Sequence, residues 1–457
     1  MDRPISSLLV SAAAALTFLP VAIQVSPVEA SQRVEHQPQI RVLVAQGVSV
    51  ELRTDGAEQL ELRLPGGKIL RLSRLQFRLS GGQLTVETPE LTDVRIPPAA
   101  GLSVTSEDPR GIWLGQRRYG GTLHLRARGG QIQVVNQLGI EPYLASVVGS
   151  EMPHTWPLAA LQAQAVAART YALRQRGRHA DYDVQATVSS QVYRGLESAT
   201  PSTQKAVDST RSLVMVHGGK LINAVFHSSS GGTTEPSGEV WRTQLPYLVS
   251  VPDHDQQSPV HRWQQRFDAN QLKAAFRETQ GLEAVDVLQT SSTGRLRSVR
   301  VRGPGGSLVL SGRELRQRLG LKSTMVSFNW LVQADGDASG PPVPGNSGDA
   351  KGIPAMIGFW RDSATGSSAA LLSSPPPLVR ETSVQVPPRG TILEVRGQGF
   401  GHGVGMSQWG ARGLAEQGAD FRQILQHYYR GVTIRPFQTT DDPAMAGNPA
   451  VRPVWKS

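Results

Sequence analysis

The chain has 457 residues, of which 39% are hydrophobic and 18% are charged, and its formal net charge is +10. This length predicts two or three folded units, and the composition excludes a chain that is disordered throughout. The absence of cysteine excludes disulfide bonds and thiolate metal sites. Because the arginines are scattered singly, we expect no nucleic-acid partner.

The first 30 residues have the features of a signal peptide. An apolar run over 8–25 is interrupted by Pro20 and followed by Val28-Glu29-Ala30, a small-x-small cleavage site. The alternative is a retained membrane anchor. No later stretch is apolar enough to cross a membrane. We therefore expect an exported protein of the periplasm or cell wall, without an integral membrane segment after cleavage, whose positive charge suits an anionic polymer.

Residues 31–138 are expected to form a β-rich region. Short segments such as IRVLVA (40–45) and LELRL (60–64) alternate apolar and polar residues, and turns such as PGG and SGG separate them. The segments are too short and too polar for a buried parallel sheet, so an antiparallel arrangement is predicted.

Two helices are expected next. Pro142 stands at the first position of a short helix that Gly149 can close. A second helix begins at Pro157 and runs to about Arg176. One face of it carries mostly alanine at helical spacing, namely Leu161, Ala165, Ala168 and Ala172. Such a face predicts that its packing partner comes very close.

The remaining chain divides by composition. Residues 139–332 form a mixed α/β core, in which Ser311 is a candidate N-cap. Residues 333–390 are Pro/Gly/Ser-rich and are expected to form a flexible insertion, 391–437 are expected to continue the core, and 438–457 to form a tail. The predicted fold class is α+β, with an antiparallel β-rich N-terminal region and a mixed α/β region that forms a cleft.

The segment GQGFGHGVGM (397–406) has glycine at every second position. In an extended strand this spacing leaves one face bare, so that another backbone or a flat ring can approach. Two interpretations stay open. The bare face is part of a polysaccharide site, with Trp409, Tyr428 and Tyr429 as aromatic platforms nearby, or it crosses tightly against the alanine-rich helix. The segment contains neither of the glycine motifs that bind nucleotides.

Few residues are candidates for chemistry. Glu151, in the bend between the two expected helices, either complements the dipole of the following helix or acts as a general acid whose pKa burial raises. His227 precedes a Ser/Gly turn, but a single histidine is a weak signal for a metal, and no nucleophile elbow surrounds Ser228. Asp253-His254-Asp255 is interpreted as a solvated loop rather than a cation site.

Together these segments resemble the stage II sporulation protein D (SpoIID/LytB) family, exported bacterial wall proteins that include lytic transglycosylases. The resemblance rests on four blocks in the family's order: VVGSEMPHTWPLAALQAQAVAARTYAL (147–173), SSQVYRG (189–195), AVFHSSSGG (224–232) and GQGFGHGVGMSQWGARGLAEQG (397–418). It implies that Glu151 is the catalytic acid and that the substrate is the peptidoglycan glycan strand after amidases have removed its stem peptides. The implied substrate-binding residues are Arg169, Tyr171, His227, Ser228, His402 and Gln408.

The chain departs from the family at two places. Gln162 stands where relatives usually have a lysine that can neutralise a substrate carboxylate. Some relatives bind zinc through a histidine and cysteines near the HSSSGG turn, and this chain has no cysteine, so we expect no metal and no cofactor.

The resemblance implies a lytic transglycosylase with a single Glu acid/base, which cleaves the MurNAc–GlcNAc bond and leaves 1,6-anhydroMurNAc. The alternative is a non-catalytic wall-binding protein that modulates an N-acetylmuramoyl-L-alanine amidase, a role to which the lost lysine at Gln162 points. A third possibility is an envelope scaffold that uses its basic surface.

Overall fold

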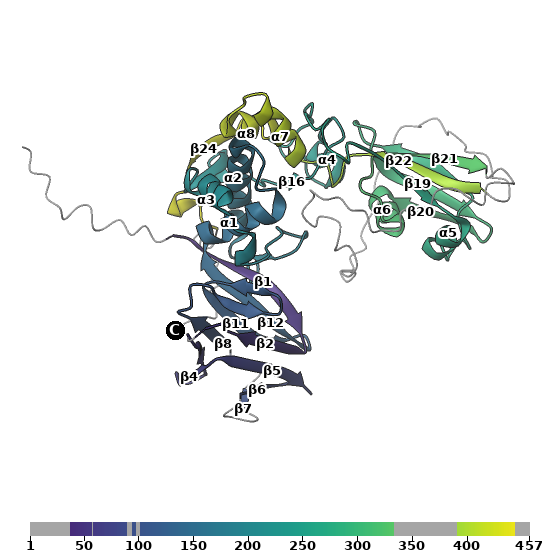
Figure 1. The fold of residues 1–457 in the computed structure, drawn as a ribbon. Coiled ribbons are helices and arrows are strands. Elements are labelled where there is room, and N and C mark those ends of the chain that lie inside the picture. Colours follow the sequence, from purple (N-terminus) through teal and green to yellow (C-terminus); the bar gives the residue numbers. More distant parts are fainter. Residues whose placement is uncertain (1–36, 57, 89–93, 97–100, 333–390, 444–457) are drawn as a thin grey trace, which may run out of the picture. The chain divides into compact units, whose positions relative to one another are not determined.

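The structure is a computed structural model that describes residues 37–443, except 57, 89–93, 97–100 and 333–390. The expected signal peptide, the insertion over 333–390 and most of the expected tail lie outside the described residues. The fold is α+β, as predicted, with several antiparallel sheets and separate helices (Figure 1). The domain boundaries and the cleft stay predictions.

The N-terminal region is made of two sheets. The first has the order β13-β1-β12-β11-β8-β3-β4, and the second β10-β9-β2-β5-β6-β7. All their pairings are antiparallel except that of β1 with the short β13, so the expected antiparallel region is confirmed. The strands are β1 (Gln39–Gly47), β2 (Ser49–Arg53), β3 (Leu60–Arg63), β4 (Ile69–Leu72), β5 (Arg74–Ser80), β6 (Gln83–Glu87), β7 (Val94–Ile96), β8 (Leu102–Ser106), β9 (Ile112–Leu114), β10 (Arg117–Tyr119), β11 (Thr122–Arg128), β12 (Gln131–Gly139) and β13 (Val184–Gln185).

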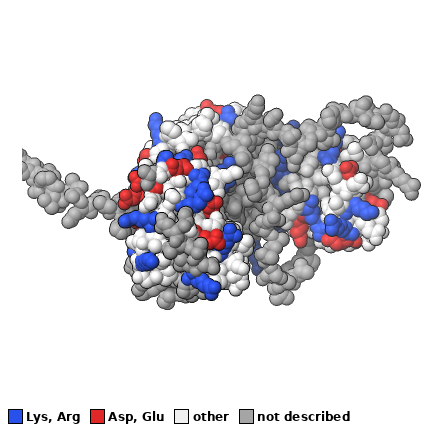
Figure 2. Space-filling view, turned by 60° about the horizontal axis from the view of Figure 1, so that its bottom comes forward, with Lys and Arg blue, Asp and Glu red and all other residues white. Residues whose placement is uncertain are grey.

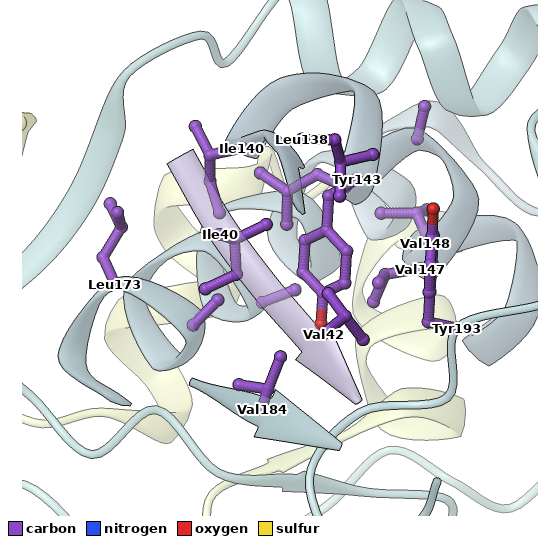
Figure 3. Close-up of a cluster of buried hydrophobic side chains, with 14 of the residues drawn as sticks. Ile40, Val42, Leu138, Ile140, Tyr143, Val147, Val148, Leu173, Val184 and Tyr193 are labelled. Atoms are coloured by element: carbon purple, nitrogen blue, oxygen red, sulfur yellow. The ribbon is translucent and has the colours of Figure 1, made fainter. Parts of the chain in front are cut away.

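Helix α1 (Ile140–Glu151) directly follows β12, and α2 (Leu158–Gln175) follows after a bend. Figure 3 shows Ile40 and Val42 of β1 in one buried cluster with Tyr143 and Val147 of α1. The expected end of the first helix at Gly149 is wrong. The helix continues for two more residues, and a Cβ at Gly149 would collide with the carbonyl oxygen of Ser198, so this glycine serves close packing.

The alanine-rich helix α2 is covered on several sides. It packs against α1, α3 (Pro201–Asp208), β14 (Leu213–His217), α7 (Gln408–Glu416) and α8 (Phe421–Tyr428). Ala165, Ala168 and Ala172 are fully buried. Small side chains allow these elements to approach the helix axis closely, as the sequence predicted.

Short strands join the middle of the chain to its C-terminal part. β16 (Phe226–His227) pairs in parallel with β23 (Met406–Ser407), and β14 pairs with both β15 (Lys220–Leu221) and β24 (Thr433–Pro436). This part of the chain also contains the short helix α4 (Ser237–Val240) and the 3-10 turns η1 (Leu196–Ser198) and η2 (Thr439–Asp441). These pairings bring the HSSSGG turn beside the glycine-rich segment.

Two further sheets share a separate hydrophobic cluster that includes Phe276, Val299 and Leu315. One has the order β17-β22-β21 and the other β18-β19-β20. Val332 pairs with Thr391, so residues 333–390 join neighbouring antiparallel strands. Ser311 caps α6, as predicted. The elements are β17 (Arg262–Phe267), α5 (Ala269–Ala275), β18 (Ala284–Thr290), β19 (Leu296–Gly303), β20 (Gly306–Ser311), α6 (Gly312–Leu319), β21 (Val326–Val332) and β22 (Thr391–Gln398).

Charged side chains are interspersed over the face shown in Figure 2, with arginine and lysine beside aspartate and glutamate. The described residues form many ion pairs, such as Arg71–Glu61 and Arg318–Glu278. Within the described part of the chain, no helix is long and apolar enough to span a bilayer.

Candidate active site

Glu151 is the last residue of α1. Met152 still donates its N–H to the carbonyl oxygen of Val148 (2.9 Å) but is itself extended, and the proline at position 153 disfavours a helical conformation for it. The expectation that Glu151 lies near the N-terminus of a helix is wrong, because α2 begins only at Leu158. At the C-terminal end of α1, the helix dipole disfavours a negative charge instead of stabilising it.

The Glu151 carboxyl is half-buried and is held by two neutral donors. The backbone N–H of Val192 donates to Oε1 (2.7 Å), and Nε2 of Gln408 donates to Oε2 (3.2 Å). Among the described residues, none forms an ion pair with it. Burial raises the pKa of Glu151, and the two hydrogen bonds and the positive charge of Arg194 oppose that rise in pKa. The protonated form is therefore more accessible near neutral pH than for an exposed glutamate.

Gln408 is the first residue of α7 and is almost completely buried. Its neighbours fix its position. Ser407 caps the helix and pairs with His227 across the parallel strands, and the N–H of Trp409 donates to the carbonyl oxygen of Ser228 (3.0 Å). The structure thus brings one sequence-predicted residue into direct contact with Glu151, although the two are 257 positions apart.

The glycine-rich segment does not form the extended strand that the sequence predicted. β22 ends at Gln398, and four of the following glycines have φ between +72° and +115°, namely Gly399, Gly401, Gly403 and Gly405. A side chain at each would collide with residues 225–230 or with Arg295. The nearest neighbours of these glycines are thus the HSSSGG segment and Arg295, so the expected crossing against the alanine-rich helix is wrong.

Two histidines meet beside this segment, with ring centroids 5.5 Å apart. His227 is buried, and its Nδ1–H donates to the carbonyl oxygen of Val404 (3.1 Å). His402 accepts a hydrogen bond at Nδ1 from the Val404 N–H (3.0 Å). Burial lowers the pKa of His227 and lowers the pKa of His402 to about 4, so both rings are neutral at neutral pH.

Two buried polar atoms near Gln408 have no hydrogen-bond partner among the described residues. They are Nε2 of His227 and Oγ of Ser228. Because Nδ1 of His227 donates to a carbonyl oxygen, its Nε2 carries a lone pair and can only accept. A polar ligand can supply the hydrogen bonds that this buried acceptor and the neighbouring hydroxyl lack.

Tyr171 lies beside the segment that holds Glu151. It is half-buried, and burial raises its pKa while a hydrogen bond with Ser190 opposes that rise. The next residue, Gln191, accepts from the hydroxyl of Tyr143 (2.9 Å) and donates to the carbonyl oxygen of Ala168 (3.2 Å). Residues 190–192 are thus fixed to both α1 and α2.

Arg169 is fully buried and does not fit the expected role in substrate binding. Its guanidinium forms a two-pronged ion pair with Glu141, with Nη2–Oε2 and Nε–Oε1 distances of 2.6 and 3.0 Å. A third nitrogen donates to the carbonyl oxygen of Leu213 (3.1 Å). A glycan has no exposed atom of Arg169 to contact, and this residue joins α1 to α2. Gln162, at the position of the missing lysine, donates to Oγ of Ser209 (2.9 Å).

The expectation of a solvated loop at Asp253-His254-Asp255 is wrong, because both aspartates are buried. Asp253 accepts hydrogen bonds from Ser230 (2.5 Å) and Tyr428 (2.6 Å), and Asp255 accepts from the N–H of Gly231 (2.7 Å). Sequence reasoning also missed Arg194, although the SSQVYRG block contains it. In the described part of the chain, no group of three or more His, Asp or Glu residues is placed to hold a metal ion.

Several known proteins are similar in sequence to this chain. The family described as SpoIID, stage II sporulation protein, matches residues 128–217, which include Glu151, Arg169 and Tyr171. The amidase enhancer of Bacillus subtilis (strain 168) is 31% identical over 309 residues, which are 64% of this chain and 40% of that protein. An uncharacterized protein of Brachyspira hyodysenteriae is 29% identical over 351 residues, or 76% of this chain and 80% of that protein.

Stage II sporulation protein D of Bacillus subtilis (strain 168) is 27% identical over 322 residues, covering 66% of this chain and 76% of that protein. The match with the amidase enhancer, described above, spans less than half the length of that protein. The family match includes the motif at 147–173. The part of the chain that is similar to the stage II sporulation protein D family is thus residues 128–217, and Glu151 lies within it.

Proposed function

We propose that this chain is an exported lytic transglycosylase that cleaves the MurNAc–GlcNAc bond of peptide-stripped peptidoglycan strands. The family match and the name of the amidase enhancer support a cell-wall-related function. The observation that carries the finer proposal is Glu151, a half-buried carboxyl with a raised pKa and two neutral donors. Perturbed carboxyls of this kind are typical of acid/base catalysts.

The reaction needs one carboxyl that first donates and then accepts a proton. Protonated Glu151 gives its proton to the glycosidic oxygen as the bond from that oxygen to C1 of MurNAc breaks. The 6-hydroxyl of the same sugar then forms a bond to C1 and returns its proton to Glu151. The ring product is 1,6-anhydroMurNAc, and the enzyme is regenerated without a water molecule.

The surroundings of Glu151 fit this scheme better than hydrolysis. Hydrolytic glycosidases use a second carboxylate beside the scissile bond. No Asp or Glu is among the described groups that bond to Glu151 or change its pKa. Between the two steps, the Val192 N–H and the Gln408 amide would stabilise the carboxylate and hold its orientation. We propose Gln408 as a positioning residue, and Tyr171, Ser228, His227 and His402 as residues that support the bound glycan.

The test uses the purified chain with amidase-stripped glycan strands and mass spectrometry of the products. We expect the wild type to release anhydro-muramyl ends and Glu151→Gln to lower the rate by about 10²–10⁴-fold. Glu283→Gln changes another half-buried glutamate, which directly precedes β18, and should retain the wild-type rate. Release by Glu151→Gln at the wild-type rate would show that the assignment is wrong.

A second candidate function is modulation of an N-acetylmuramoyl-L-alanine amidase. The 31% identical relative is named an amidase enhancer, which favours it. In this case the chain alone is retained on glycan strands without cleaving them, and it raises the rate of an added amidase. Glu151→Gln should then stimulate the amidase as well as the wild type does.

A further inference from the structure

We infer that a pocket beside Glu151, formed by Trp156, Trp409 and Arg412, is a subsite for one uncharged pyranose ring of the glycan strand. This inference rests on the proposed function, since it assigns the pocket to the same substrate. The pocket has a volume of about 440 Å³, within the range of about 300–1,000 Å³ that is common for small-molecule sites.

The pocket lies between residues 153–157, which follow Glu151 closely in the chain, and helix α7, which begins with Gln408. Pro153, two residues after Glu151, lines one side, and two peptide units place its Cα within about 8 Å of the Glu151 Cα. Trp409 lines the other side and directly follows Gln408, whose amide donates to Glu151. A strand that is cleaved at Glu151 therefore has a neighbouring sugar within reach of this pocket.

The aromatic part of the pocket is already ordered. The rings of Trp156 and Trp409 meet edge to face, with centroids 4.8 Å apart and planes at 63°. The guanidinium of Arg412 lies over both rings, 5.5 Å from the centroid of Trp156 and 5.0 Å from that of Trp409. Trp409 is half-buried, so part of its indole is available to the apolar C–H face of a sugar. A preformed surface loses little conformational entropy when a ligand binds.

The charges of the pocket favour a neutral ligand. Arg412 is paired with Glu416 (2.7 Å), and the two side chains are 28% and 30% exposed. The pair offers donors and an acceptor together without net charge, which matches sugar hydroxyls because each hydroxyl both donates and accepts. An anionic group such as the lactyl carboxylate of a stripped MurNAc would find no unpaired cation here, because Glu416 already neutralises Arg412. The ring that fits is thus the uncharged GlcNAc.

The test measures binding of chitotetraose, a neutral GlcNAc oligomer, to the full chain carrying Glu151→Gln. Adding Arg412→Gln should raise Kd by roughly tenfold, the effect of one lost hydrogen bond to a charged donor. Glu416→Gln, which removes only an acceptor, should also weaken binding. Because the ligand is uncharged, Kd should stay the same from low to high salt.

Arg318→Gln is the matched control. Arg318 is also 28% exposed, pairs with Glu278 (2.8 Å) and lies over an aromatic ring, that of Phe276. The Arg318→Gln variant should leave Kd within about twofold of its starting value. An equal loss of affinity in Arg412→Gln and Arg318→Gln overturns the inference. Unchanged binding in both Arg412→Gln and Glu416→Gln, each folded by near-ultraviolet circular dichroism, also overturns it.

The cleavage assay separates this inference from the proposed function. If cleavage requires Glu151 but chitotetraose binding ignores Arg412, the subsite is wrong and the transglycosylase stands. If binding depends on Arg412 but no cleavage occurs, the pocket is a glycan site of a non-catalytic protein.

Discussion

The two ends of α1 each carry a glutamate, and the two side chains have opposite environments. Glu141, in the first turn, is buried and bound by two nitrogens of Arg169, where the helix dipole also favours an anion. Glu151, at the last position, is half-buried, has only neutral donors and faces the unfavourable end of the dipole. A buried carboxyl that forms an ion pair makes a structural link, whereas a buried carboxyl without an ion pair can exchange a proton.

This difference is not visible in the local sequence. Glu141 directly precedes Pro142, and Glu151 precedes Pro153 by two positions, so both glutamates lie beside a helix boundary signal. The partners that distinguish them come from 28 residues away for Glu141 and from 257 residues away for Glu151. The comparison thus predicts that changes at the first end reduce stability and that changes at the second end reduce activity.

The largest expected effect is at the first end. Arg169→Met leaves the carboxylate of Glu141 buried without its cation, and loss of one partner of a buried pair costs about 3–5 kcal/mol. Urea unfolding measures this loss. Arg211→Met is the control, because Arg211 and Asp208 form an exposed pair that contributes less than about 1 kcal/mol. If both variants lose equally little free energy of unfolding, Glu141 and Arg169 do not form the structural link that we describe.

The second end depends on the glycine-rich segment that leads to Gln408. Gly399 has φ +72°, and a Cβ there would lie 2.6 Å from backbone atoms of Ser229 and Ser230. Gly399→Ala should therefore lower the free energy of unfolding by about 2–3 kcal/mol. The loss combines the strain of alanine in a left-handed conformation with displacement of the neighbouring backbone. The substitution should also lower the cleavage rate, because the displacement reaches the strands that position Gln408.

Gly320→Ala is the matched control for this variant. Gly320 ends α6 with φ +61° and ψ +34°, and a Cβ there would meet nothing within 4 Å. Gly320→Ala therefore adds only the strain of a left-handed alanine, which should lower the free energy of unfolding by about 1 kcal/mol, and the cleavage rate should not change. Equal stability losses in the two variants would mean that close packing at Gly399 contributes nothing.

The sequence predicted the elements whose signals are local. Alternation with glycine turns predicted the antiparallel strands of residues 39–139, and Ser311 predicted a helix cap. The glycine segment was misinterpreted because glycine at every second position has two physical causes, a bare strand face or a backbone with positive φ. The second cause applies at Gly399 to Gly405, and periodicity does not distinguish the two.

The contacts of the candidate site could not be predicted from local sequence patterns. The Val192 and Gln408 contacts of Glu151 join three distant segments, and only the family resemblance singled out Gln408 in advance. Asp253 and Asp255 were expected in solvent because three consecutive polar residues are typical of loops. Their burial depends on donors from Ser229, Ser230 and Gly231, more than 20 positions upstream. Such compensation is a property of the tertiary structure.

The smallest expected effect concerns the stability of Glu151→Gln against pH. Burial raises the pKa of Glu151 in the folded chain, so between the ordinary glutamate pKa and this raised pKa the folded state binds more protons than the unfolded state. The contribution of Glu151 to the free energy of unfolding therefore falls as pH rises through that window. The substitution removes this loss, and Gln408 can rotate its amide to offer its oxygen to the new side chain. Urea unfolding should show Glu151→Gln more stable than the wild type at neutral pH, with the gain disappearing below the ordinary glutamate pKa. A variant that is less stable than the wild type at neutral pH would place Glu151 with Glu141, as a structural residue whose charge the fold needs.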